Sequence, residues 1–148
     1  MKITVCGSIA FIDQMLECQT VLEKSGHIVY IPSFTAEDPE GNPMDKKEFY
    51  RIRKEGKMDL KWFEKEKARA IREHFDEIVK GDAILVTNYE KNGVPGYIGG
   101  NTLMEMGLAF HFKKPIYLLY PLPEISYKEE IIGMLPIVLD GDLSNISE

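Results

Sequence analysis

The sequence predicts an α/β fold: a doubly wound, flavodoxin- or Rossmann-like parallel sheet of five strands with helices on both faces. Short runs rich in β-forming residues alternate with amphipathic helical segments along the 148 residues, and this alternation is typical of parallel sheets. Residues 83–87 are apolar or β-branched throughout, as in a strand that is covered on both faces. The length suits one domain, which we expect to span residues 1–148.

The first part of the chain supplies two strands and one helix. Residues 2–8 form the first predicted strand, and residues 12–24 carry an apolar stripe at helical spacing. Residues 27–31 form the second strand, which Pro32 closes. We therefore expect the first strand–helix–strand unit to end near residue 32.

Residues 35–56 have a different character, with a run of turn formers followed by a charged stretch. They predict either a solvated loop with a short helix, or a lid over a binding site. Phe49, Tyr50 and Trp62 offer ring faces for a nucleobase or packing surfaces for an amphipathic helix.

The second part repeats the alternation. Residues 58–79 have apolar positions at helical spacing and a charged outer face, predicted to be solvated and held by salt bridges. The remaining predicted elements are the strand at 83–87, a glycine-rich loop, a helix that Asn101 or Thr102 caps, a strand at 116–120, a helix at 127–134 and a strand at 137–139.

Glu105 is the one charged residue between Lys91 and Lys113, and it lies in a helix that is apolar on nearly every side. Two explanations are open. Thr102 and Glu105 match a T-x-x-E capping box, in which the carboxylate binds the cap's amide. Alternatively, Glu105 faces a cavity beyond the carboxyl ends of the strands, where open α/β sheets bind ligands.

The central stretch resembles the nucleoside 2-deoxyribosyltransferase superfamily, which includes the 2'-deoxynucleoside 5'-monophosphate N-glycosidases. The resemblance rests on a strand that begins with Asp82, a loop with glycines at 93–100, an E-x-G-x-A helix at 105–109, and Lys114-Pro115. The C-G-S-I of residues 6–9 is similar to the first-strand motif of the monophosphate glycosidases. The matching parts cover most of the chain outside roughly residues 35–60.

This resemblance implies cleavage or transfer of an N-glycosidic bond, with Glu105 as the carboxylate that attacks or stabilises C1'. It also implies an acid shortly before the Asp82 strand. His74 stands at that place and Asp76 lies two residues on, so both are candidates for the second catalytic group. Predicted substrate-binding residues are Gly7, Ser8, Ile9, Asp82, Asn88, Tyr97, Gly99, Gly100, Asn101 and Met104. Asp82 also fits a turn or cap residue.

Some positions depart from the family pattern. Thr4 stands where the monophosphate glycosidases have Tyr, and Ala10 stands where they have a phosphate-binding Arg. Gly99 and Gly100 fill the region of a second Asp of the transferases. These departures predict little dependence on a 5'-phosphate, and they keep open a nucleotide- or nucleoside-binding sensor without catalysis. A flavodoxin-like redox protein is a weaker alternative, because no phosphate-binding Ser/Thr-rich first loop is present.

Composition limits the choice of partners. The net charge of −6 argues against a nucleic-acid polymer, which binds through phosphate neutralisation, but leaves a small nucleoside or nucleotide possible. The sequence has no apolar run of about 20 residues, no visible signal peptide, and two cysteines that form no metal or disulfide pattern. We expect a cytoplasmic protein with no membrane partner, no cofactor and no metal. The resemblance implies a homodimer or larger homo-oligomer.

Overall fold

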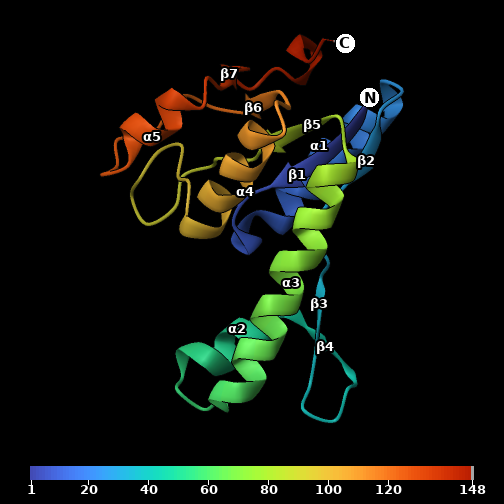
Figure 1. The fold of residues 1–148 in the computed structure, drawn as a ribbon, viewed down its shortest axis with the longest axis vertical. Helices are drawn as coiled ribbons and strands as arrows, with labels where there is room; N and C mark the ends of the chain where they lie inside the picture. The colour runs from blue at the N-terminus through green and yellow to red at the C-terminus, as the bar shows by residue number, and fades with distance from the viewer. Residues whose placement is uncertain (148) are drawn as a thin grey trace.

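The structure, a computed structural model, describes residues 1–147 and confirms the five-stranded parallel sheet (Figure 1). The strand order is β2-β1-β5-β6-β7, and every neighbouring pair is parallel. The strands are β1 (Lys2–Cys6), β2 (Ile28–Tyr30), β5 (Ala83–Val86), β6 (Ile116–Leu118) and β7 (Ile137–Val138). β1 and β5 lie side by side within the sheet, so the loops after them meet at one edge.

Helices cover both faces of this sheet. α1 (Ile12–Lys24) packs on one face, and α4 (Gly100–His111), α5 (Lys128–Gly133) and the C-terminal half of α3 (Leu60–Lys80) pack on the other. Because successive strand residues point to opposite faces, Ala83 and Leu85 join the core on the α1 side, while Ile84 and Val86 join the core under α4.

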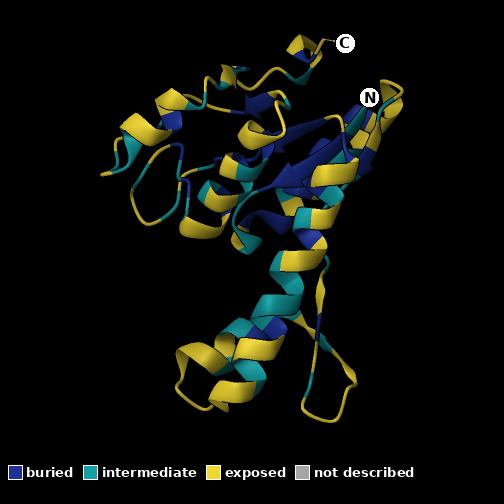
Figure 2. Ribbon diagram, viewed as in Figure 1, coloured by how far each residue is buried: buried dark blue, intermediate teal, exposed yellow. Residues whose placement is uncertain are grey.

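The N-terminal half of α3 extends beyond the sheet together with β3 (Thr35–Glu37), β4 (Pro43–Asp45) and α2 (Lys46–Lys54). We call residues 35–70 the arm. β3 and β4 pair as an antiparallel hairpin, which the sequence did not predict. Figure 2 shows that most of the arm is exposed or half-buried.

The arm has a small core of its own. The ring of Phe49 is buried, contacts Tyr50 and Trp62 edge-on and stacks on Phe63 at a centroid distance of 5.9 Å. Phe49 and Trp62 therefore pack the arm, which is the second of the two interpretations of these rings.

In the described part of the chain, none of the helices is both long and apolar enough to cross a membrane. Two short 3-10 helices, Ile9–Phe11 after β1 and Leu143–Asn145 near the C-terminus, complete the fold.

Candidate functional site

A pocket of about 710 Å³ opens at the carboxyl ends of β1, β2 and β5. Its floor is formed by the turn after β1 and the start of α4, and its side walls come from the loop after β5, α3 and α2. The pocket therefore lies where the strand order of an open α/β sheet predicts a ligand site, and the arm supplies one wall.

Most of the predicted site residues line this pocket. They are Gly7, Ser8, Ile9, His74, Tyr97, Gly99, Gly100, Asn101, Met104 and Glu105. Gly7 is required where the chain leaves β1, because a Cβ there would collide with the side-chain oxygen of Thr87.

Three predicted residues lie outside the pocket lining. Asp76 is exposed, because two residues along a helix from His74 correspond to about 200° of rotation. Asp82 precedes β5, at the opposite end of the strand from the pocket, and its carboxylate accepts a hydrogen bond from the backbone nitrogen of Lys2 at 2.6 Å. Asp82 therefore acts as a turn or cap residue, the alternative role that the sequence allowed for it.

Asn88 is the third, and it is fully buried. Its amide nitrogen donates to the backbone oxygens of Tyr120 at 2.9 Å and Pro121 at 3.2 Å, and its Oδ1 accepts from the nitrogen of Tyr120 at 2.8 Å. Asn88 thus ties the loop after β5 to the loop after β6, and its polar atoms are occupied by the protein itself.

The capping box predicted for α4 does not form. The helix begins two to three residues earlier than expected, with Gly99 in place of Asn101 or Thr102 as a cap that makes no side-chain hydrogen bond. Thr102 and Glu105 are consequently inside the helix, and Glu105 lies beyond the first turn, where free backbone amides would have stabilised its charge. The glycines of this loop let the backbone enter the helix without a capping side chain.

Glu105 instead faces a small polar cluster with Cys6 and His74. Its Oε1 lies 3.7 Å from Nε2 of His74, and the same nitrogen lies 3.5 Å from the Cys6 sulfur. The second carboxyl oxygen of Glu105 is buried and has no hydrogen-bond partner among the described residues. Burial raises the pKa of Glu105 to about 8, against smaller opposing effects of the Cys6 thiol, Lys67 and Lys46.

Burial lowers the pKa of His74 to about 4, and the positive charge of Lys46 adds to this shift. These shifts favour the neutral imidazole and the neutral carboxyl group near pH 7. Cys6 is fully buried, and burial raises the pKa of its thiol well above the usual range. Because Cys6 and Glu105 approach the same imidazole nitrogen, the cluster lacks the arrangement of a cysteine triad, in which the acid binds the other nitrogen.

The ligand atoms of Cys6, His74 and Glu105 lie within 4.8 Å of one another, a spacing that could hold a metal ion. Lys46 and Lys67 both act on Glu105 through their charges, and they would repel a divalent cation at this point. The charges beside the cluster therefore disfavour a metal ion at this point.

Sequence reasoning missed the cations of the pocket. Five basic side chains line it, against Glu105 as the one acid in the lining: Lys46, Arg53, Lys54, Lys67 and Lys91. Lys67 lies in the 58–79 stretch, whose charged residues the sequence predicts to form a solvated, salt-bridged face, but it lines the pocket instead. Four of these cations belong to a mixed-charge stretch and gave no signal, because only the tertiary placement of the arm separates them from the acids.

Comparisons with known proteins support the fold. No protein-family model and no curated protein sequence matches the chain. Among solved structures, a 2-deoxyribosyltransferase from Bacillus psychrosaccharolyticus is similar, with a TM-score of 0.52 and 16% identity over 80% of this chain and 71% of that one. A CMP N-glycosidase from Clostridium botulinum aligns with a TM-score of 0.47 and 14% identity over 93% of this chain and 85% of that one.

Proposed function

We propose that this protein, which shares the fold of a 2-deoxyribosyltransferase, cleaves or transfers the N-glycosidic bond of a nucleoside or nucleotide with Glu105 as the nucleophile. The observation that carries the proposal is the buried carboxyl group of Glu105, which lines a pocket at the carboxyl ends of the strands and has one oxygen without a partner. A buried acid with a shifted pKa in a cleft is a functional candidate.

The reaction follows from the chemistry of a carboxylate at C1'. An oxygen of ionised Glu105 forms a bond to C1' while the bond from C1' to the base nitrogen breaks, and the base leaves with the electron pair and takes up a proton. Water, or the nitrogen of a second base, then attacks C1' and releases the glutamate.

His74 is better placed to position Glu105 than to protonate the base. Its Nε2 faces the nucleophile at 3.7 Å, and its ring is 6% exposed. The departing base must lie on the opposite side of the sugar from Glu105, so a proton donor would have to come from another wall. Tyr97 and Asn101 line the pocket and are available to contact the substrate.

A binding module without catalysis is the second candidate. It is favoured by the raised pKa of Glu105, which keeps the carboxyl group neutral near pH 7, and by the absence of a second carboxyl group from the described lining. Such a protein would hold a nucleotide in the same pocket and leave its glycosidic bond intact.

Incubation with a panel of nucleosides and nucleotides, followed by chromatography for free base, separates the two functions. We expect base release by the native protein and none by Glu105→Gln, which keeps the shape of the side chain but cannot attack C1'. Asp76→Asn, an exposed change on the neighbouring helix, is the matched control and should retain activity. Equal base release by the native protein and Glu105→Gln would refute the role of Glu105 as the nucleophile. Binding of a nucleoside or nucleotide by the native protein without base release would favour the non-catalytic binding module.

A further inference from the structure

The cations of the pocket lack acidic partners within residues 1–147, the part of the chain that the structure describes. None of the five basic side chains forms an ion pair with a carboxylate among the described residues, although most other arginines and several other lysines do. The chain as a whole has a net charge of −6, so a group of unpaired cations around one cavity differs from the average charge of the surface. An anionic ligand would supply the missing counter-charge.

Neutral groups hold these cations at separate points. The ammonium group of Lys46 donates to the backbone oxygen of Ser33 at 3.0 Å, and that of Lys67 to the hydroxyl of Tyr50 at 3.3 Å. The guanidinium of Arg53 lies 4.0 Å above the Phe63 ring. On the other side of the pocket, Lys91 donates to the hydroxyl of Ser8 at 2.8 Å. These contacts orient the side chains and leave their charge unneutralised.

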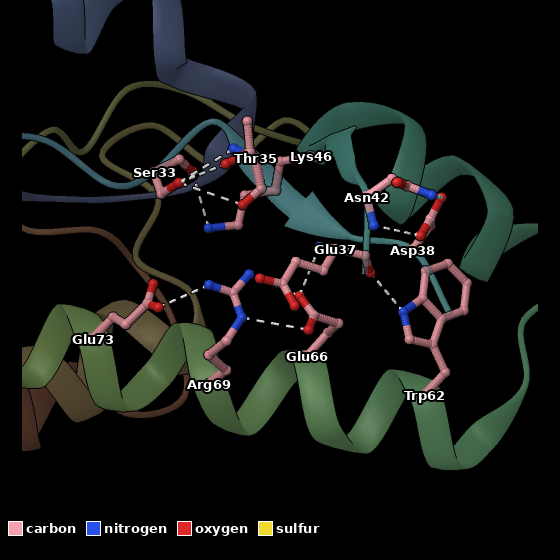
Figure 3. A network of polar contacts seen from close by, with 10 residues as sticks. All are labelled: Ser33, Thr35, Glu37, Asp38, Asn42, Lys46, Trp62, Glu66, Arg69 and Glu73. Atoms are coloured by element: carbon pink, nitrogen blue, oxygen red, sulfur yellow. Dashed lines mark hydrogen bonds and ion pairs between the residues drawn. The ribbon is translucent and has the colours of Figure 1, made fainter. Parts of the chain in front are cut away.

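The arm that carries four of the five cations is firmly attached (Figure 3). Glu66, which is 3% exposed, accepts a hydrogen bond from the backbone nitrogen of Glu37 at 2.9 Å and pairs with Arg69 at 2.8 Å. Trp62 donates its indole N–H to the backbone oxygen of Glu37 at 2.7 Å. The hairpin is thereby fixed to α3, and the cations are presented from a preorganised wall.

The cations extend well beyond the cluster around Glu105. Lys67 precedes His74 by seven residues on α3, which corresponds to about 10 Å along the helix. Lys46 begins α2, and Arg53 and Lys54 end it, again about 10 Å apart along the axis. Lys46 and Lys67 are near enough to Glu105 to act on its charge, whereas Arg53 and Lys54 belong to the far end of α2.

We propose that the ligand of this pocket carries a chain of at least two phosphate groups, as in a nucleoside di- or triphosphate, with its sugar at Glu105 and its phosphates along the arm. The inference rests on the proposed function for the placement of the sugar. One phosphate can accept charge-assisted hydrogen bonds from two or three neighbouring cations, but cations whose helix positions lie about 10 Å apart need more than one phosphate to bind them all.

The arm reverses the expectation of little phosphate dependence. That expectation came from Ala10, which stands at a phosphate-binding position of the resembling enzymes. The arm lies mostly outside the region of resemblance and offers phosphate-binding groups from elsewhere in the chain. Burial and the charge of Arg69 lower the pKa of Lys46, and an anion beside Lys46 would relieve this unfavourable environment.

The test measures binding with the Glu105→Gln variant, so that turnover does not interfere. Calorimetry in the presence of EDTA compares a deoxynucleoside, its 5'-mono-, di- and triphosphates, and inorganic triphosphate. We expect the Kd to fall about tenfold with the first phosphate and about tenfold again with the second. Equal affinity for the nucleoside and its phosphates would overturn the proposal. So would a diphosphate that binds no more tightly than the monophosphate, or inorganic triphosphate that binds as tightly as the nucleoside triphosphate.

Two lysines on the same helix provide the matched control. Lys67→Met should lose most of the affinity gained from the first phosphate, which would lie nearest Glu105, whereas Lys65→Met, an exposed change two residues away, should retain it. Loss of the same affinity in both variants would mean that general charge, and not the arm, binds the ligand, and would overturn the proposal. Base release by the native protein is measured separately. Tight binding of the diphosphate without base release would support the phosphate site and refute the catalytic function.

Discussion

At the scale of single residues, Glu105 combines a high cost of ionisation with a position in an open pocket. Its carboxyl group is kept neutral by burial, and the nearby charges of Lys67 and Lys46 only partly offset this effect. A substrate that develops positive charge at C1' would stabilise the ionised form at the moment when it is needed. The unusual environment of this side chain leads to two predictions.

The first prediction is a rise of kcat/KM with pH. A carboxyl group with a pKa of about 8 is protonated at lower pH and cannot attack C1'. We expect kcat/KM to increase about tenfold per pH unit up to about pH 8 and to level off above it, because this quantity reports the ionisation of the free enzyme. Initial rates of base release over this range provide the measurement. A profile that is flat between about pH 6 and pH 8 would contradict it.

The second prediction concerns stability. In the unfolded chain Glu105 ionises near its ordinary pKa of 4.5, whereas in the folded protein it stays neutral up to about pH 8. Raising the pH through this window therefore destabilises the native protein, by up to about 1.4 kcal/mol for each pH unit. Glu105→Gln cannot ionise and should escape this loss.

Melting temperatures of the native protein and Glu105→Gln at about pH 5 and pH 8 test it. The variant should gain stability relative to the native protein as the pH rises. The exposed change Glu64→Gln serves as the control and should show no such trend. A constant difference between the native protein and Glu105→Gln at both pH values would refute the burial of a neutral carboxyl group.

The candidate site residues could be predicted from the sequence only where a motif determined their position relative to the strands. Glu105, Gly7 and Ser8 follow strand ends in the chain, so the topology brought them together in the pocket as expected. The prediction of Asp82 as a binding residue was wrong, because a residue that precedes a strand lies at the opposite edge of the sheet from a residue that follows the strand. Asn88 follows its strand correctly, but the sequence could not show that the loop after β6 would occupy its amide.

At the scale of elements, the β3–β4 hairpin of the arm is held to α3 by a few polar contacts. Its two strands have three residues each and pair only with one another, so they add little stability of their own. The buried carboxylate of Glu66 connects this hairpin to the helix and to Arg69. The position of the cations in the pocket wall depends on this connection.

We therefore predict that Glu66→Ala costs about 2 kcal/mol, because it removes a charged acceptor and leaves the Glu37 amide without its partner. Urea unfolding gives the loss of stability. Hydrogen exchange should accelerate within residues 35–45 while β1 and β5 keep their protection. Glu64→Ala, on the exposed side of α3, should change neither. Unaltered exchange at the hairpin in Glu66→Ala would show that other contacts hold the arm.

The elements around the sheet were predictable, and the hairpin was not. Apolar runs and helical periodicity located every strand of the main sheet within a few residues. β3 and β4 lack an apolar alternation, and Ala36 is their one buried residue. The turn formers between them were read as a loop, because a hairpin that is stabilised by a distant glutamate leaves no periodic signal.

At the scale of the whole molecule, apolar side chains remain exposed after the sheet is covered. Phe110 and Phe112 near the end of α4 are 49% and 47% exposed, whereas Tyr117 is buried in the core and Tyr97 lines the pocket. The fold class was predictable because alternation alone determines a parallel sheet. The assembly of the protein was not predictable from the residues, since the sequence does not distinguish an apolar side chain that is buried against a partner from one that is exposed to water.

We predict a homodimer or larger assembly at micromolar concentration, held in part by the end of α4. Light scattering coupled to size-exclusion chromatography should show it for the native protein. Replacing both Phe110 and Phe112 by Asp should shift the protein toward monomers, because it places charges in an apolar contact. Val21→Asp, at an exposed position on α1, should not. A native protein that remains monomeric would refute the assembly.

The position of Trp62 on the arm makes the arm spectroscopically distinct from the sheet. Trp62 is the one tryptophan of the chain, and it has an edge-on contact with Phe49 and an indole N–H bonded to Glu37. Indole emission excited at the red edge therefore originates from the arm alone, without a contribution from the seven tyrosines. The native protein thus carries a built-in fluorophore whose emission wavelength, quenching and anisotropy describe the local environment and motion of the cation-bearing wall, without any label.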